Sequence, residues 1–342
     1  YDSFPMEYST HGIGDFRETA LAIKDFNGNT TCKLRYCSHK IYEGKKELKD
    51  LPATFGKNNE CTSLEITCLD EDANLEVILI YTVFESLDVI TRSVRVENIG
   101  KEEVYLTKVL SMCIDFDGLN YDMISLHGSW ARERHILRKK VTYGTQTVSS
   151  VRGESSHQDN PFIVLLDSSA TQDFGEVYGF NLVYSGNFLA QVEGCQFDTT
   201  RVLMGINPSD FEWKLEPNEE FVAPEVVMVY SDEGIGKMTR TFHDLYRNHL
   251  IRGKFKDKKR PILINNWEAT YFDFDTDKLL LIAREAANVG IEMLVMDDGW
   301  FGHRNADNSS LGDWIINENK IKGGLKYLVD EVNKLGDRKS TR

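Results

Sequence analysis

Long apolar runs and positive charge are both scarce in this sequence. No apolar stretch approaches the roughly 18 residues that a membrane-spanning helix needs. Lys and Arg total 40 against 54 Asp and Glu, which gives a formal net charge of -14. Nucleic acids and anionic membrane surfaces repel so acidic a chain. We therefore expect neither nucleic acid nor a membrane as a partner.

Cysteine spacings typical of metal or redox sites are also missing. The six cysteines are Cys32, Cys37, Cys61, Cys68, Cys113 and Cys195, and none forms a CxxC pair. In a chain of 342 residues they indicate reduced structural thiols, which favours a cytoplasmic location. The first residues, YDSFPMEYSTHG, show no signal-peptide pattern and no initiator Met, so we expect part of the N-terminus to be missing.

Histidines are few and scattered. His127, His135, His157 and His303 lie apart in the sequence, and none is part of an HxH or HExxH pattern. Isolated histidines are usually surface residues or hydrogen-bonded core residues. We assign no metal site and no cofactor.

The first two-thirds of the chain is rich in strand-forming patterns. Residues 75–84 (LEVILIYTVF) are dense in β-branched and aromatic side chains, and residues 89–96 alternate apolar and polar. Similar segments occupy residues 104–111, 162–166, 177–184, 188–192 and 225–230. Turn signals such as Asn27-Gly28 separate these segments. Strands in series with few helices predict a large antiparallel β-sandwich over residues 1–233.

The pattern changes after residue 233. Residues 234–250 carry apolar side chains at helical spacing, and the basic segment 252–261 (RGKFKDKKRP) follows them. We predict a linker helix over residues 234–255 and a second domain over residues 256–342.

The second domain reads as strand, helix, strand, helix. Strands are predicted at residues 262–266 and 291–296. Asp275 or Thr276 can cap the first helix, and Gly290 ends it. The apolar faces expected to be buried are Leu279, Ile282, Ala283, Ala286 and Val289 in the first helix, and Leu325, Leu328, Val329, Val332 and Leu335 in the second. Helical crossovers of this kind require parallel strands.

Aromatic and acidic residues follow both predicted strands. Trp267 and Glu268 come after the first strand, and Asp297, Asp298 and Trp300 come after the second. In α/β barrels the carboxyl ends of the strands build the active site. An indole packs well on a sugar ring, and paired carboxylates accept hydrogen bonds from vicinal hydroxyls. The pattern favours a sugar site, although Asp-Asp-Gly is also a common turn and a following Trp often only packs.

Stretches along nearly the whole chain resemble the α-galactosidases of glycoside hydrolase family 36. They are GDFR (14–17), YTVFESLDVITRSVRVEN (81–98), HGSWARER (127–134), SSHQDNPF (155–162), VYSGNFLAQVE (183–193), MGINP (204–208), LINNWEATYFDF (263–274), DDGWFGHR (297–304) and SSLGDW (309–314). The resemblance implies an N-terminal antiparallel β-supersandwich followed by a TIM (β/α)8 barrel. It also implies retaining hydrolysis of terminal α-galactosyl groups, as in melibiose and raffinose.

The resemblance also implies roles for individual residues. Trp267 would line the galactose pocket, and Asp297 and Asp298 would bind the O4 and O6 hydroxyls. Trp130 would be the contribution of the sandwich near the pocket, and packing between domains is the alternative. Glu268 receives no catalytic role. A homo-oligomer, suspected to be a tetramer, and an α-galactosyl oligosaccharide substrate are the expected partners.

Two further residues are left open between binding and packing. Asp313 and Trp314 follow the second predicted strand closely, so they either line the rim of the pocket or pack a loop.

The sequence departs from the family pattern in its last part. Retaining glycosidases need a nucleophile and an acid/base, and the family motifs that supply them are not present. A complete barrel needs about 250 residues, so we expect a fragment with only the first two β/α units. Residues 337–342 look foreign to the family pattern, and residues 291–296 should form an open sheet edge with exposed apolar faces.

Two other functions stay open at this point. The chain could be a non-catalytic carbohydrate-binding or assembly module that uses the residues after the two strands. It could also come from an α-N-acetylgalactosaminidase of the same clan, because the Asp297-Asp298 pair fits a galacto-configured ring in either case.

Overall fold

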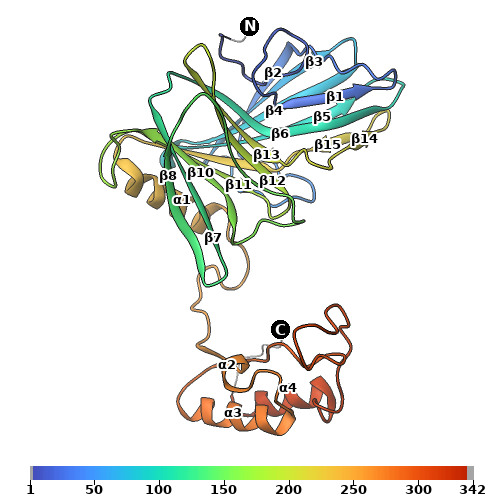
Figure 1. The fold of residues 1–342 in the computed structure, drawn as a ribbon, viewed down its shortest axis with the longest axis vertical. Coiled ribbons are helices and arrows are strands. Elements are labelled where there is room, and N and C mark those ends of the chain that lie inside the picture. Colours follow the sequence, from blue (N-terminus) through green and yellow to red (C-terminus); the bar gives the residue numbers. More distant parts are fainter. Residues whose placement is uncertain (1–2, 337–342) are drawn as a thin grey trace. The chain divides into compact units, whose positions relative to one another are not determined.

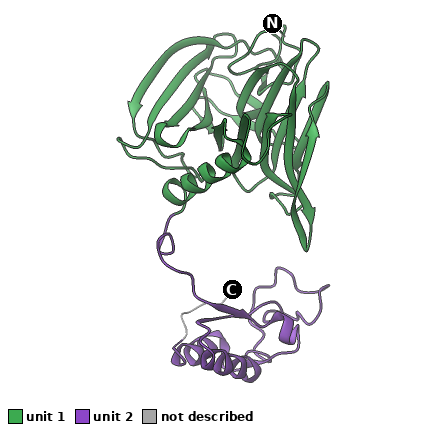
Figure 2. Ribbon diagram, turned by 90° about the vertical axis from the view of Figure 1, so that its left-hand side faces the viewer, with its two compact units in different colours: residues 1–251 green, residues 252–342 purple. Residues whose placement is uncertain are grey.

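The computed structural model describes residues 3–336, which form strands followed by alternating strands and helices (Figure 1). They divide into two compact units, Tyr1–Ile251 and Arg252–Arg342 (Figure 2). Each unit has its own hydrophobic core. The predicted departure at residues 337–342 lies outside the described residues.

Unit 1 is an antiparallel β-sandwich. The larger sheet has the order β2 (Arg35–Glu43), β3 (Thr62–Asp70), β4 (Leu75–Phe84), β5 (Val89–Asn98), β16 (Glu225–Ser231), β11 (Val177–Val183), β10 (Asp159–Asp167), β7 (Tyr121–Ser129) and β8 (Arg132–Lys140), with β15 (Glu220–Val222) paired to β5. The smaller sheet has the order β1 (Leu21–Asp25), β6 (Val104–Asp117), β13 (Thr199–Ile206) and β12 (Phe188–Gly194), with β14 (Trp213–Leu215) paired to β6. β9 (Gly144–Ser150) packs beside β12, and a short 3-10 helix, η1 (Glu85–Leu87), joins β4 to β5.

The sandwich core follows the two-residue period of its strands. On β10, Ile163 and Leu165 join the cluster between the two sheets, whereas Val164 and Leu166 join a cluster on the outer face of the larger sheet. Successive side chains of a strand point to opposite faces. Both faces of β10 are therefore buried, and the segment reads as a continuous apolar run in the sequence.

Helix α1 (Gly234–His249) covers part of that outer face (Figure 1). Its buried Met238, Phe242 and Leu245 pack with β11 and β16. A side chain at Gly179 would place its Cβ 2.4 Å from the sulfur of Met238, so glycine is needed for this close approach. The predicted linker helix over residues 234–255 thus differs from the structure, in which α1 packs within unit 1 because its apolar face finds a partner there.

Most predicted strands are present, with different ends. Residues 75–84 form β4 as predicted, whereas the segment at 104–111 continues as β6 to Asp117 because β13 pairs with the added residues. Several strands were not predicted, among them the interior strands β3, β7 and β13 and the edge strands β2 and β8. β2 and β8 lie at the ends of the larger sheet and are mostly exposed, and most of their side chains are polar or charged. Charged edge strands resist pairing with other chains.

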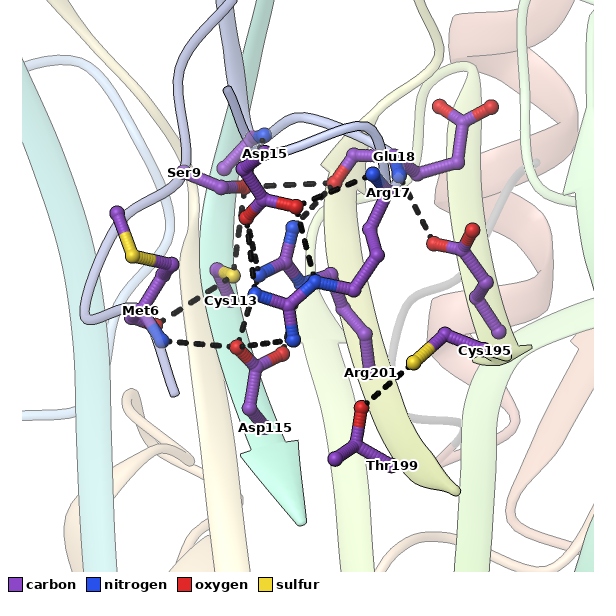
Figure 3. Close-up of polar contacts among 12 residues, drawn as sticks. Met6, Ser9, Asp15, Arg17, Glu18, Cys113, Asp115, Cys195, Thr199 and Arg201 are labelled. Carbon is purple, nitrogen blue, oxygen red and sulfur yellow. Dashed lines mark hydrogen bonds and ion pairs between the residues drawn. The ribbon is translucent and has the colours of Figure 1, made fainter. Parts of the chain in front are cut away.

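A buried charge network ties the N-terminal segment to the smaller sheet (Figure 3). Arg201 of β13 donates to Asp115 of β6 at 2.7 Å and to Asp15 at 2.9 Å, and Arg17 donates to Asp15 at 2.9 Å. The four side chains are at most 3% exposed. Burial alone would raise the pKa of Asp15, but hydrogen bonds from Arg17 and the charge of Arg201 outweigh it and lower that pKa below its ordinary value.

Unit 2 contains the predicted strand-helix-strand-helix order. β17 (Leu263–Asn265) and β18 (Met293–Val295) are parallel neighbours, as the crossover rule requires. The helices are α2 (Trp267–Thr270), α3 (Thr276–Asn288) and α4 (Gly324–Lys334). β18 is shorter than the predicted 291–296, because Ile291 donates its backbone N–H to the end of α3 instead of to β17.

The helix signals are confirmed, and the burial pattern is partly wrong. The Asp275 side chain caps α3 by accepting the backbone N–H of Lys278 at 2.9 Å, and Gly290 follows the helix with a φ of +83°. Val289 is 76% exposed because it lies beyond the last turn of α3, and the unpredicted Leu280 is buried instead. In α4 only Leu328 is fully buried.

The apolar side chains exposed near the sheet edge are not the ones predicted. Within residues 3–336, β18 pairs only with β17. Ile262, just before β17, and Leu263, at its start, have exposed apolar side chains, whereas Leu294 of β18 is buried. The predicted apolar exposure at 291–296 is therefore wrong for the centre of that strand. No helix in the described part of the chain is both long and apolar enough to cross a membrane.

Candidate functional site

The residues that follow β17 and β18 meet at one edge of the small sheet, as the strand order predicts. The backbone N–H of Asp297 donates to the side-chain oxygen of Asn266 at 2.8 Å. The side-chain amide of Asn265 donates to Oδ2 of Asp297 at 2.5 Å. These two bonds join the NNW and DDGW motifs directly.

Asn265 and Asn266 were not singled out from the sequence, although both are central to this edge. Oδ1 of Asn265 accepts the backbone N–H of Trp267 at 2.8 Å, so one amide positions both Trp267 and Asp297. Asn266 is fully buried, and its amide donates to Oγ1 of Thr270 at 2.9 Å. The available signal was two adjacent amides at the end of a strand, where unpaired backbone groups need partners.

Aromatic neighbours fix the orientation of Trp267. Its half-buried indole packs edge-on against Tyr271 at 5.3 Å and against Phe272 at 5.0 Å between ring centroids. Tyr271 adopts a φ of +46°, which turns the chain sharply after α2. An indole in a fixed plane is suited to stacking against the C–H surface of a sugar ring.

The two adjacent carboxylates have different surroundings. Asp297 accepts from Asn265 and, through Oδ1, from the backbone N–H of Asp298 at 2.7 Å. Asp298 accepts from the Arg304 guanidinium through both of its oxygens, at 2.9 Å and 2.7 Å. Hydrogen bonds from Arg304 and its charge lower the pKa of Asp298 below its ordinary value and outweigh the opposing effect of burial. Asp298 is therefore held in the charged form, which accepts hydrogen bonds.

Arg304 is a central residue of the site that the sequence reading did not assign. It is 5% exposed, and its Nη1 donates to the backbone carbonyls of Ala306, Asp307 and Ser309 at 2.7–2.9 Å. Its guanidinium also lies 5.6 Å from the centre of the Phe272 ring. Arginine at the end of the DDGWFGHR motif was visible in the sequence, but the loop that buries it was not.

Lys320 adds a second positive charge on the same side of the unit. Its ammonium donates to the backbone carbonyl of Phe272 at 2.8 Å and to that of Gly299 at 3.2 Å. Burial lowers the pKa of Lys320, and the negative charges of Asp273 and Asp298 oppose that change. Lys320 thus links the segment after β17 to the turn after β18 by hydrogen bonds.

Other aromatic and acidic residues pack away from this cluster or face solvent. Trp300 packs with the core of unit 2, and its ring lies 5.2 Å from that of Phe301. The ring centroids of Trp314 and Phe301 are 4.6 Å apart, which supports the alternative that Trp314 packs a loop. Asp313 and Glu268 are exposed.

Trp130 belongs to unit 1, at the turn between β7 and β8. It is 84% exposed, so it does not serve as a packing residue inside that unit. Two surface cavities of unit 1, of about 530 and 580 Å³, are not lined by Trp130. Its assignment to the sugar pocket stays a prediction.

The described residues offer no ready metal centre. Between residues 3 and 336, no group of three or more His, Cys, Asp or Glu side chains is arranged to hold a metal ion. The chemistry of the cluster is instead that of hydrogen-bond acceptors beside an aromatic ring.

Comparisons with known proteins agree with the motifs. Residues 1–216 match the model of the glycosyl hydrolase family 36 N-terminal domain, and residues 220–339 match the melibiase model. The α-galactosidase AgaA of Geobacillus stearothermophilus is 54% identical over 98% of this chain and 46% of its own length. The α-galactosidase Mel36A of Lactobacillus acidophilus is 48% identical over the same shares.

A solved structure is similar over the same region. The crystal structure of AgaA has a TM-score of 0.96 at 53% identity and covers 99% of this chain and 48% of the AgaA chain. An AgaA variant has been crystallised in complex with raffinose. The chain thus spans about half the length of the relatives that it matches.

Proposed function

This chain belongs to glycosyl hydrolase family 36, and from that premise we propose that it is part of an α-galactosidase. The complete enzyme would remove terminal α-galactosyl groups from oligosaccharides such as melibiose and raffinose, with retention of configuration. The names of the similar proteins and the raffinose complex of AgaA support this substrate class.

The observation that carries the proposal is the joined edge of β17 and β18. Asn265 bonds to both Trp267 and Asp297, so an aromatic surface and a carboxylate are fixed relative to each other. We infer that the indole packs on the sugar ring while Asp297 and Asp298 accept hydrogen bonds from O4 and O6. Galactose carries an axial O4, so a fixed acceptor at that position discriminates against glucose through an unpaired polar group.

The catalytic carboxyl groups belong to the remainder of the complete protein in this proposal. Retention requires a nucleophile and an acid/base about 5 Å apart. The relatives extend to about twice the length of this chain, which leaves room for both groups. The described residues then bind and orient the galactosyl group, and they perform no covalent step.

We further propose that unit 2 begins a TIM (β/α)8 barrel and that Trp130 contributes to the pocket of the complete enzyme. The parallel pairing of β17 and β18 supports the barrel. The six free cysteines fit a reducing cytoplasm. A homo-oligomeric enzyme is inferred from the family resemblance.

Hydrolysis of p-nitrophenyl α-D-galactoside by the complete protein tests the function. We expect turnover of this substrate and none of the β-galactoside. Asp297→Asn should lower kcat/KM at least ten-fold, since hydrogen bonds to charged groups contribute about 1.5–3 kcal/mol. Asp277→Asn, at an exposed position of α3 that has no assigned role in the site, is the matched control.

The alternatives give different results in the same assay. Binding of galactose by the complete protein without turnover indicates a carbohydrate-binding module. A preference for the α-N-acetylgalactosaminide indicates the related enzyme class. Absence of both binding and turnover rejects the sugar site itself.

A further inference from the structure

Arg304 connects the two groups that we assign to galactose binding. Its guanidinium holds Asp298 on one side and lies over the Phe272 ring on another, and Phe272 packs edge-on against Trp267. A continuous series of contacts therefore runs from the Asp298 carboxylate to the Trp267 indole through two side chains, the buried Arg304 and the half-buried Phe272.

We propose that Arg304 is a positioning residue for the galactosyl group, acting through Asp298 and, by way of Phe272, through Trp267. This inference rests on the proposed function and deepens it, because it adds a residue that touches no substrate and still sets how tightly the sugar is bound.

The guanidinium can position its partners because it is itself immobile. Its Nη1 donates to three backbone carbonyls of the loop that closes over it, Ala306, Asp307 and Ser309. Nε and Nη2 then form the two-pronged bond to the Asp298 carboxylate, with Nε 2.9 Å from Oδ1 and Nη2 2.7 Å from Oδ2. Such planar pairing fixes the direction of a carboxylate as well as its distance, and lysine cannot reproduce it.

Arg304 also compensates the negative charge of the two adjacent aspartates. Asp297 and Asp298 are adjacent, and two neighbouring carboxylates favour protonation of one of them unless cations compensate. Arg304 is in direct contact with Asp298, and Lys320 lies close enough to add to the compensation. With Arg304 in place, Asp298 keeps an ionised acceptor for a sugar hydroxyl.

The turn after the carboxylates depends on the same arrangement. Gly299 has a φ of +98°, and a Cβ there would lie 3.0 Å from the Phe272 ring and 3.4 Å from the backbone oxygen of Arg304. The backbone N–H of Gly299 donates to Oδ1 of Asp298 at 2.8 Å. The loop is thus built so that the Arg304 backbone, Phe272 and Asp298 converge.

Arg304→Gln and Arg304→Lys in the complete enzyme test the proposal. We expect Arg304→Gln to raise the KM for p-nitrophenyl α-D-galactoside at least ten-fold with a smaller change in kcat. Arg304→Lys keeps the charge without the planar bond, so it should restore part of the KM and leave the rest. Arg284→Gln, which removes an exposed arginine of α3, should leave both constants unchanged.

A second measurement is independent of turnover. The titration of the Asp298 carboxyl carbon, followed by NMR in the 342-residue chain, should move to higher pH in Arg304→Gln and return toward the wild-type position in Arg304→Lys. This direction follows because the hydrogen bonds and the charge of Arg304 lower the pKa of Asp298 against the opposing effect of burial, with support from Lys320.

The outcomes separate the two claims. Unchanged KM and unchanged Asp298 titration in Arg304→Gln, with only lower thermal stability, would overturn the positioning role. If Arg304→Gln does not fold, a wild-type KM and titration in Arg304→Lys overturn it equally. If the wild-type enzyme hydrolyses no α-galactoside, the proposed function fails, and the claim that Arg304 sets galactosyl binding fails with it; the Asp298 titration then reports only on the local pairing.

Discussion

Replacing Arg201 by Met should destabilise unit 1 strongly. The Arg201 side chain is 0% exposed and bonds to two buried carboxylates, Asp15 and Asp115, and to the backbone oxygen of Glu18. Methionine fills similar space but leaves both carboxylates with Arg17 as their remaining cation (Figure 3). Removing one partner of a buried ion pair costs about 3–5 kcal/mol.

The magnitude converts to an observable shift. For a domain of about 250 residues, 1 kcal/mol changes the melting temperature by roughly 2–4 °C, so Arg201→Met should lower it by about 6–20 °C. Urea unfolding followed by circular dichroism in the β-sheet region gives the free energy, because the large sheets all lie in unit 1. Arg247→Met is the control, since its pair with Asp244 is exposed and such pairs contribute less than about 1 kcal/mol.

The pH dependence supplies a sign to check. The pKa of Asp15 is lowered in the folded state. Ionised Asp15 therefore contributes its full stabilisation above the unfolded pKa of about 4, and this stabilisation is lost as the pH falls through the pKa of the folded state. The stability advantage of the wild type over Asp15→Asn should therefore shrink below about pH 4.

A loss of unfolding free energy under about 1 kcal/mol in Arg201→Met at pH 7 would refute the reasoning.

Three more predictions concern local features. Gly299→Ala should lower the stability of unit 2 by about 1–3 kcal/mol, and Gly290→Ala should lower it less. A Cβ at Gly299 would lie 3.0 Å from an aromatic ring, whereas a Cβ at Gly290 would have no atom within 4 Å. Calorimetry of both variants measures the difference. Asp275→Ala removes the side chain that accepts a backbone N–H at the start of α3 and should cost about 1 kcal/mol, whereas Asp277→Ala in the same helix should cost less; equal losses would contradict the capping role. Of the six thiols, Cys37 is the exposed one, so a native-state thiol titration should show one fast group, and Cys37→Ser should abolish it.

Prediction from sequence located some buried strands and missed others, since β13 is buried along most of its length and was not predicted. β4 was located correctly because much of it is buried and its residues are strongly strand-forming. β2 and β8 were missed because edge strands expose their side chains and resemble loops in composition. Local periodicity reports burial, and it cannot report pairing at an exposed edge.

The same distinction applies to the candidate site. Asp297, Asp298 and Trp267 could be brought to one edge from the sequence, since the crossover rule places the carboxyl ends of parallel strands together. The bonds of Asn265 and Arg304 depend on the course of the following loops, which has no period. The pair between Arg201 and Asp15 joins residues 186 positions apart, and nothing local marks it.

The unit 2 residues that we propose to bind the galactosyl group are linked to one another within two β/α units. Asn265 sits between Trp267 and Asp297, and Arg304 sits between Phe272 and Asp298, so each carboxylate has its own link to the aromatic side. All of these residues lie between positions 265 and 304 of unit 2. Loss of either link should disturb the arrangement of the carboxylates and the indole in part, because a shift of about 1 Å already weakens an oriented site. The single variants at Asn265 and Arg304 should therefore each weaken galactoside binding while leaving the other carboxylate in place, and the double variant should weaken it by more than either.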